Sequence, residues 1–193
     1  MKEVLANMLS KKEIRENKNN ILNRLSLIDR KGVNDFVDFL VNSDFFSAPA
    51  STMFHGNFEG GLAAHSYSVY EEFDNKIEHY SLDIPKDSRF LTGICHDLCK
   101  VGFYVPNVLA DGSVSTSKPY KVLDDFPFGH GEKSVLIAQQ YFSLTNQESL
   151  IIRWHMSNYD EAWRQYKDKV EALHPEVMLF QNADKEVSLF RGL

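Results

Sequence analysis

Apolar side chains recur at intervals of three, four and seven residues along most of this chain, and that spacing limits the folds open to it. In the segment 62–80, for example, Val69, Phe73 and Ile77 fall on one face of a helix. The same spacing predicts helices over residues 1–30 (one or two), 33–41, 85–102, 132–142, 147–156, 161–170 and 176–190. We therefore expect an all-α fold whose helices bury their apolar faces against one another.

Two segments interrupt the helical pattern. Residues 47–61 contain Pro49, Gly56 and the pair Gly60-Gly61, a composition typical of a loop. Residues 103–129 carry Asp111-Gly112 between short runs of valine and tyrosine, which predicts a short β-hairpin or extended excursion. Because histidine-bearing segments flank this excursion, we expect it to form a lid or a wall for a substrate.

The length of 193 residues is typical of one globular domain, and no composition break marks a linker. We expect residues 1–44 to form N-terminal helices packed on a single globular unit, residues 45–193. A formal net charge of −6 offers no broad basic surface for nucleic acid. No apolar run is long enough to cross a membrane and no secretory signal is visible, so we expect no membrane contact and a cytoplasmic location. Cys95 and Cys99 are interpreted as small buried side chains.

Several residues with metal-binding capacity lie on or beside the apolar stripes. His65 and His155 follow apolar helix positions by three or four residues, and Asp184 stands among the core positions of the last predicted helix. Burying an unpaired carboxylate costs several kcal/mol. A bound cation would offset that cost, so the pattern points towards a metal site.

Each of these residues also has an ordinary structural interpretation. A single histidine on an apolar face is more often a satisfied core side chain than a ligand. An inward aspartate is more often hydrogen-bonded to a helix N-terminus or an arginine, and the pair His96-Asp97 alone is weak evidence. Taken together, however, four of the seven histidines fall at helix positions facing the core, and one directly precedes Asp97. That conjunction favours a metal site.

The order of these residues resembles the ligand pattern of the HD-domain superfamily of metal-dependent phosphohydrolases. The segment GGLAAHS (60–66) is similar to the start of the HD domain in small bacterial and phage proteins and in a bacterial 3′-to-5′ exoribonuclease. HDLCKVG (96–102) resembles the frequent form in which a lysine follows the HD pair, and GHGEKS (129–134) and RWHM (153–156) complete the pattern. The resemblance covers about residues 45–190.

The resemblance implies an HD-domain helical bundle, with residues 45–193 as a phosphohydrolase domain that binds two divalent ions. Four residues would hold the first ion: His65, His96, Asp97 and Asp184. His130 and His155 would hold the second, with Asp97 bridging the two. Mn, Fe, Ni, Co and Zn suit these ligands, and Mg is an option at the more oxygen-rich position. A hydroxide bridging the ions would attack phosphorus, which makes Asp97 a catalytic residue.

Three further residues are candidates for contact with the substrate. In similar HD proteins a lysine at the position of Lys100 approaches the phosphate, where it would stabilise developing negative charge. The alternative for Lys100 is an exposed cation at a helix C-terminus. His55, in the loop before the first ligand, and Arg153 are weaker candidates for phosphate contacts, and Arg153 could equally be a surface residue.

The resemblance implies a small phosphorylated substrate, and our first hypothesis is hydrolysis of a nucleotide or short oligonucleotide phosphoester, either a monoester or a diester. The sequence contains no Gly-Tyr-Pro tripeptide, so the cyclic-di-GMP phosphodiesterase subclass is not supported. A second hypothesis is a non-catalytic HD module that binds a nucleotide or a protein partner and uses its metals structurally. The third is a helical bundle without metal. The sequence predicts no oligomeric state.

Overall fold

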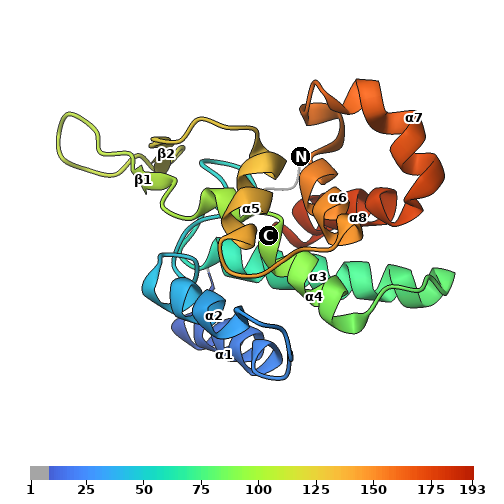
Figure 1. The fold of residues 1–193 in the computed structure, drawn as a ribbon. Helices are drawn as coiled ribbons and strands as arrows, with labels where there is room; N and C mark the ends of the chain where they lie inside the picture. Colours follow the sequence, from blue (N-terminus) through green and yellow to red (C-terminus); the bar gives the residue numbers. More distant parts are fainter. Residues whose placement is uncertain (1–8) are drawn as a thin grey trace.

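The computed structural model describes residues 9–193, and within that range the fold is mostly helical, with eight α-helices and one small antiparallel hairpin (Figure 1). The prediction of an all-α fold with a short β excursion is confirmed. Residues 1–8 of the first predicted helical segment lie outside the described residues. The helices are α1 (Lys11–Leu25), α2 (Val33–Asn42), α3 (Gly61–Tyr80), α4 (Lys86–Cys95), α5 (His130–Gln139), α6 (Asn146–Trp154), α7 (Trp163–Leu173) and α8 (Pro175–Glu186).

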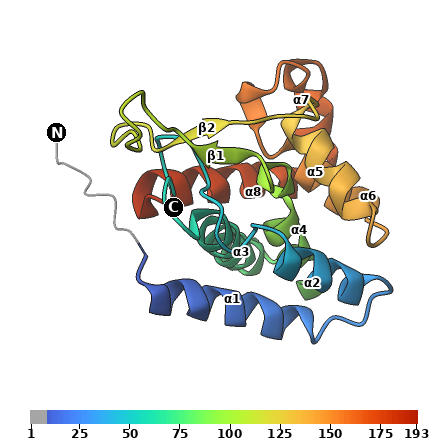
Figure 2. The same cartoon turned by 90° about the vertical axis from the view of Figure 1, so that its left-hand side faces the viewer.

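Helix α3 is the longest helix of the described chain and lies against α1, α4 and α8. Figure 2 shows α3 nearly end-on, with α1 on one side of it and α8 on the other. The first turn of α3 places Leu62 and Ala63 in one cluster of buried apolar side chains. Its later turns place Val69, Phe73 and Ile77 in a second cluster. Helix α3 therefore spans the boundary between two apolar cores.

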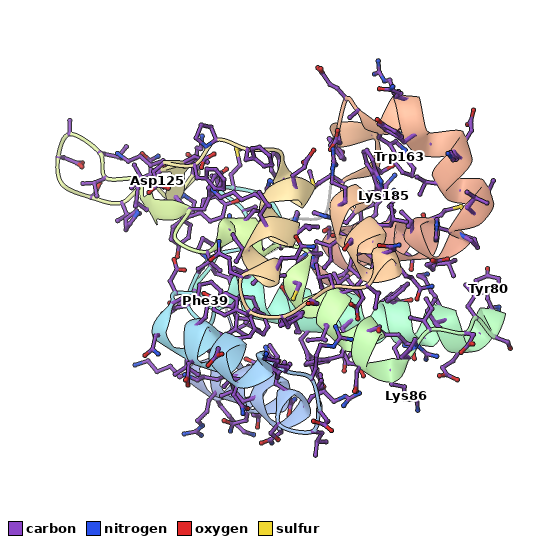
Figure 3. All side chains as sticks on the ribbon, in the orientation of Figure 1. Phe39, Tyr80, Lys86, Asp125, Trp163 and Lys185 are labelled. Carbon is purple, nitrogen blue, oxygen red and sulfur yellow. The ribbon has the colours of Figure 1, made fainter. Side chains whose placement is uncertain are left out.

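The N-terminal helices belong to the first of these cores. Ile21 and Leu25 of α1 and Phe36 of α2 are fully buried in the same cluster as the apolar residues of α4. The second core is built by α3, α6, α7 and α8. Most of α7 is exposed, but Trp163 at its start (Figure 3) and Val170 are buried in this second core.

The helix predicted over 85–102 ends earlier than expected. Helix α4 stops at Cys95, and Asp97 leaves the helical region with φ −109° and ψ 20°. A short 3-10 turn, η1 (Leu98–Lys100), follows. In a continuous helix, neighbouring side chains point about 100° apart. The break changes the direction of the chain between His96 and Asp97, so both side chains can face one centre.

The excursion between η1 and α5 forms an arm of two short strands, β1 (Tyr104–Pro106) and β2 (Tyr120–Val122). The strands are antiparallel, with Tyr104 opposite Val122, and Figure 1 shows the arm projecting from the helices. At its tip, Gly112 adopts φ +82°, a conformation that glycine tolerates best. In the part of the chain that the structure describes, no helix combines the length and apolar character that crossing a membrane requires.

Candidate metal centre

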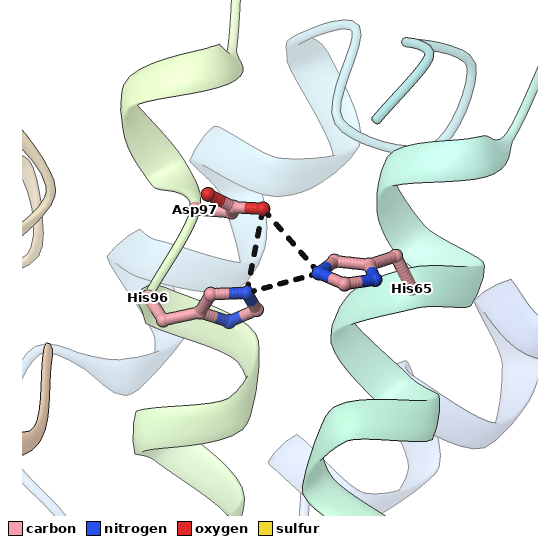
Figure 4. Close-up of side chains that lie close together, drawn as sticks. All are labelled: His65, His96 and Asp97. Carbon is pink, nitrogen blue, oxygen red and sulfur yellow. Dashed lines mark hydrogen bonds and ion pairs between the residues drawn. The ribbon is translucent and has the colours of Figure 1, made fainter. Parts of the chain in front are cut away.

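His65 of α3 meets His96 and Asp97, which follow α4, in one group of side chains (Figure 4). His65 lies in the first turns of α3, and His96 and Asp97 follow the end of α4. The Nε2 atoms of His65 and His96 are 3.3 Å apart. They lie 3.6 and 3.3 Å from the Oδ2 atom of Asp97. All three side chains are almost completely buried.

The second oxygen of Asp97 faces another pair of imidazoles. His130 begins α5 and His155 directly follows α6. Their Nε2 atoms lie 3.4 and 3.6 Å from Oδ1 of Asp97. His155 is buried, whereas the side chain of His130 is 30% exposed and is an accessible edge of the cluster. Asp97 therefore stands between two pairs of histidines, with one carboxylate oxygen towards each.

Asp184 completes the group from α8. Its Oδ1 atom is 3.2 Å from Nε2 of His65, and its side chain is 19% exposed. The structure thus brings together all six residues predicted as metal ligands, from five separate stretches of the chain: His65, His96, Asp97, His130, His155 and Asp184.

Two glycines allow the helices that carry these residues to approach closely. A Cβ atom at Gly93 of α4 would lie 2.5 Å from the Cβ of Tyr70 on α3. A Cβ atom at Gly131 of α5 would lie 2.1 Å from the carbonyl oxygen of Arg153 on α6. Both distances are shorter than real carbon contacts allow. The missing side chains therefore permit the approach of α3 to α4 and of α5 to α6 that brings the histidines together.

Backbone carbonyl groups orient two of the imidazole rings. The Nδ1 atom of His96 is 2.8 Å from the carbonyl oxygen of Gly93, and that of His155 is 2.7 Å from the carbonyl oxygen of Ile152. Each Nδ1 must donate its proton to the carbonyl, which places the lone pair of a neutral ring on Nε2. In both residues that lone pair faces Asp97. In metal sites a hydrogen bond of this kind fixes the orientation of a ligating histidine.

The cluster does not satisfy its own hydrogen-bonding groups. Among the described residues, the buried side-chain atoms without a hydrogen-bond partner include Asp97 Oδ1, His130 Nε2, His155 Nε2 and His65 Nδ1. Unpaired buried polar atoms are uncommon and call for a physical explanation. Here three of the four belong to the Oδ1 side of the cluster, where acceptor atoms face one another.

The donor atoms fit a divalent cation. Atoms that bind a metal at about 2.0–2.2 Å lie about 3–3.5 Å from one another at octahedral or tetrahedral angles. The separations of donor atoms from Asp97 or His65 run from 3.2 to 3.6 Å. The donor atoms of His65, His96 and Asp97 all lie within 4.8 Å of one another. Imidazole and carboxylate suit first-row transition metals, with an oxygen-rich position also open to Mg. The residues present therefore form a buried His/Asp cluster that could bind metal.

The charges of the cluster reinforce one another. Burial alone would raise the pKa of Asp97, but Lys100 and the surrounding histidines hold that pKa well below its usual range. Burial lowers the pKa of His96, which keeps its ring neutral at pH 7. The pKa of His155 would also be lowered by burial, but the Asp97 carboxylate raises it instead. Asp97 is therefore the negative centre of the group.

Lys100 is part of this buried group and not an exposed helix-terminal cation. Its Nζ atom lies 2.7 Å from Oδ2 of Asp97, and the residue is only 8% exposed. Burial alone would lower the pKa of Lys100, but the Asp97 carboxylate raises it. Lys100 therefore carries a positive charge directly beside the candidate ligands.

His55 and Arg153 lie at different distances from the centre. The ring of His55 is tilted against that of His65, with centroids 5.2 Å apart. Burial, and then the neighbouring His65 and Lys100, lower the pKa of His55 to about 4. Arg153 instead forms ion pairs with Glu132 and Asp160 and covers the ring of Trp154. Arg153 shares a surface hollow with His130 and does not reach the centre of the cluster.

Cys99 is the residue near the centre that the sequence did not assign to the site. The interpretation as a buried side chain agrees with its 2% exposure. Its sulfur, an Asp97 oxygen and a His130 nitrogen all lie within 4.8 Å of one another. Burial raises the pKa of the Cys99 thiol to about 12. Cys99 follows Asp97 by two residues. This spacing indicates a place near the centre only if the 3-10 turn after Asp97 is already known.

In comparisons with protein-family models, with curated proteins and with solved structures, nothing matches this chain.

Proposed function

We propose that this chain is a metal-dependent phosphohydrolase of the HD-domain type that acts on a phosphoester of a nucleotide or short oligonucleotide. The observation that carries this proposal is the placement of Asp97, whose two carboxylate oxygens each face a separate pair of imidazoles. A carboxylate in that position can bridge two cations. Two-ion sites of this kind serve phosphoryl transfer because they act on both the attacking and the leaving oxygen.

The residues divide into two sets of ligands that share Asp97. His65, His96 and Asp184 would hold one divalent ion with Oδ2 of Asp97. His130 and His155 would hold a second with Oδ1, and Cys99 lies within reach of that position. Bound ions of this type lower the pKa of water and polarise a phosphoryl oxygen. The carbonyl groups of Gly93 and Ile152 keep two of the imidazoles aimed at the centre.

Lys100 and His55 would act on the phosphate of the substrate. The buried ammonium of Lys100 lies beside Asp97 and is able to stabilise negative charge that develops on the phosphoryl oxygens. His55, neutral at pH 7, lies beside His65 and would donate a hydrogen bond to the same group. Hydrolysis adds water to phosphorus and breaks the ester P–O bond, and the leaving oxygen departs with a proton as an alcohol.

An activity screen of the purified full chain tests the proposal. The wild type and Asp97→Ala would be assayed with a panel of nucleotides and dinucleotides in added Mn²⁺ or Ni²⁺. We expect Asp97→Ala to lower turnover more than about 100-fold, because both sets of ligands lose their shared carboxylate. Asp38→Ala, at an exposed position of α2, serves as the matched control and should retain full activity.

Two results would contradict the proposal. One is a wild-type protein that contains metal yet hydrolyses no member of the panel. That result would favour the hypothesis of a non-catalytic binding module. The other is turnover in Asp97→Ala equal to that in Asp38→Ala, which would place the chemistry elsewhere.

A further inference from the structure

A hollow of about 270 Å³ opens directly beside the candidate metal centre, and His130 lines both. Its other walls come from the start of α5, the end of α6 and the turn that leads into α7. Small-molecule sites typically occupy about 300–1,000 Å³, so this hollow matches one small organic group and not an oligonucleotide. A substrate whose phosphate lies at the metal centre would extend its leaving group past His130 into this space.

The charges in the hollow are predominantly negative. Glu132, Asp160 and Glu161 contribute three carboxylates, and Arg153 contributes one guanidinium. The guanidinium is already paired, because Arg153 binds Glu132 and its Nη1 atom lies 2.5 Å from Oδ2 of Asp160. A second phosphate on the leaving group would therefore meet carboxylates without a free cation to balance it.

Two other groups are suited to an uncharged organic ligand. Tyr159 is 88% exposed at the rim of the hollow, which leaves the face of its ring open for stacking. Glu161 lines the same hollow and is exposed, so its carboxylate can accept a hydrogen bond from a hydroxyl or amino group. An aromatic face beside free acceptors is the chemistry that recognises a nucleoside.

We propose that this hollow receives the uncharged nucleoside portion of the substrate. The chain then selects nucleoside monophosphates over substrates whose leaving group carries a further phosphate. This inference rests on the proposed phosphohydrolase function and narrows it from phosphoesters in general to one class. Tyr159 contacts the base, and Glu132 and Glu161 set the preference against negative charge. Arg153 is a positioning residue that holds Glu132 and Asp160 in place.

Release of inorganic phosphate from a nucleoside 5′-monophosphate and from the matching 5′-diphosphate tests the selectivity. Phosphate released from the diphosphate reports attack on the terminal phosphorus alone, with a charged nucleotide as the leaving group. We expect kcat/KM for the monophosphate to exceed that for the diphosphate by about tenfold or more in the Mn²⁺-loaded wild type. Glu161→Lys should narrow this ratio by about three- to fivefold.

Asp168→Lys, at an exposed position of α7 outside the lining of the hollow, makes the same change of charge and should leave the ratio unchanged. Tyr159→Ala should lower kcat/KM for the monophosphate by about fivefold or more, as loss of a stacked base does. The loss that this variant causes with methyl phosphate, which has no group to fill the hollow, should be smaller than its loss with the monophosphate. Equal use of the two nucleotides by the wild type, or equal losses on both monoesters, would overturn the inference.

A binding measurement separates failure of this inference from failure of the proposed function. Calorimetric titration of the chelator-treated chain with the four common nucleosides requires neither metal nor turnover. Binding that Tyr159→Ala weakens about fivefold and Asp168→Lys does not would support the hollow even in a chain without activity. An active wild type whose nucleoside binding is absent or unaffected by Tyr159→Ala would leave the phosphohydrolase standing and remove the nucleoside site.

Discussion

Two buried polar groups in this domain differ in how they meet their hydrogen-bonding needs. Glu148 is fully buried, and both its oxygens accept hydrogen bonds, from Arg30 at 2.8 and 3.0 Å and from the Thr145 amide at 2.8 Å. Asp97 is equally buried, but its Oδ1 atom has no hydrogen-bond partner among the described residues, and the imidazole nitrogens around it are also unpaired.

Glu148 therefore has its hydrogen bonds complete within the described chain, whereas Asp97 has an acceptor atom left unpaired there. The Arg30–Glu148 pair ties the segment after α1 to the start of α6 and is complete within the chain. A cation in the space between its acceptor atoms would complete the Asp97 cluster. The Arg30–Glu148 pair should therefore stabilise the fold with or without metal, whereas the stabilising effect of the Asp97 cluster should depend on metal.

Removal of the arginine should give the largest change in stability. Arg30→Met leaves the Glu148 carboxylate buried without its counter-ion, and we expect the free energy of unfolding to fall by about 3 kcal/mol. Urea denaturation with and without chelator measures this loss, which should be the same under both conditions. Arg24→Met is the matched control, because the Arg24–Asp87 pair is more exposed and should contribute about 1 kcal/mol or less. A smaller loss in Arg30→Met than in Arg24→Met would contradict the structural role of the pair.

Metal removal should have a slightly smaller effect on stability. At a free Mn²⁺ concentration about ten times the dissociation constant, two bound ions together stabilise a folded chain by about 2.8 kcal/mol, so chelation should lower the Tm by about 5–10 °C. Differential scanning calorimetry measures the shift. Asp97→Ala should show no shift on chelation, because neither set of ligands would bind. If chelation moves the Tm of both proteins equally, the cation acts somewhere other than at Asp97.

The pH dependence of the Arg30–Glu148 pair should be the smallest of these effects. Burial alone would raise the pKa of Glu148, but its hydrogen bonds with Arg30 and Thr145 lower that pKa below 4.5. A lowered folded-state pKa stabilises the chain above the unfolded-state value, and this contribution is lost as the pH falls through the folded-state value. The free energy of unfolding should therefore fall below about pH 4.5, and less steeply in Glu148→Gln. Chemical denaturation across that range checks the slope, and parallel curves for the two proteins would contradict the prediction.

The helical parts of the fold were predictable because their apolar residues repeat at helical spacing. The pattern around Val69 and Phe73 located α3, and Asp111-Gly112 located the turn of the arm. The end of α4 at Cys95 was not predictable in this way, because apolar residues continue beyond it in Leu98 and Val101. Tertiary contacts of the cluster override the local pattern there.

The membership of the cluster was predictable, but its internal organisation was not. Polar residues on apolar stripes, such as His65, His155 and Asp184, must meet a partner in the core, and a resemblance of motifs added His130. The sequence could not show that one oxygen of Asp97 faces each pair of imidazoles, because this depends on the break after His96. Nor could it show that Arg153 is paired with carboxylates beside His130. These are contacts between distant segments, which residue spacing does not encode.

Calorimetric titration of the chelator-treated chain with Mn²⁺ tests the central claim most directly. We predict two bound ions per chain for the wild type, one for His155→Ala, which loses a ligand on the Oδ1 side of Asp97, and none for Asp97→Ala. A wild-type chain that takes up no more Mn²⁺ than Asp97→Ala would show that the unpaired atoms around Asp97 do not form a metal centre.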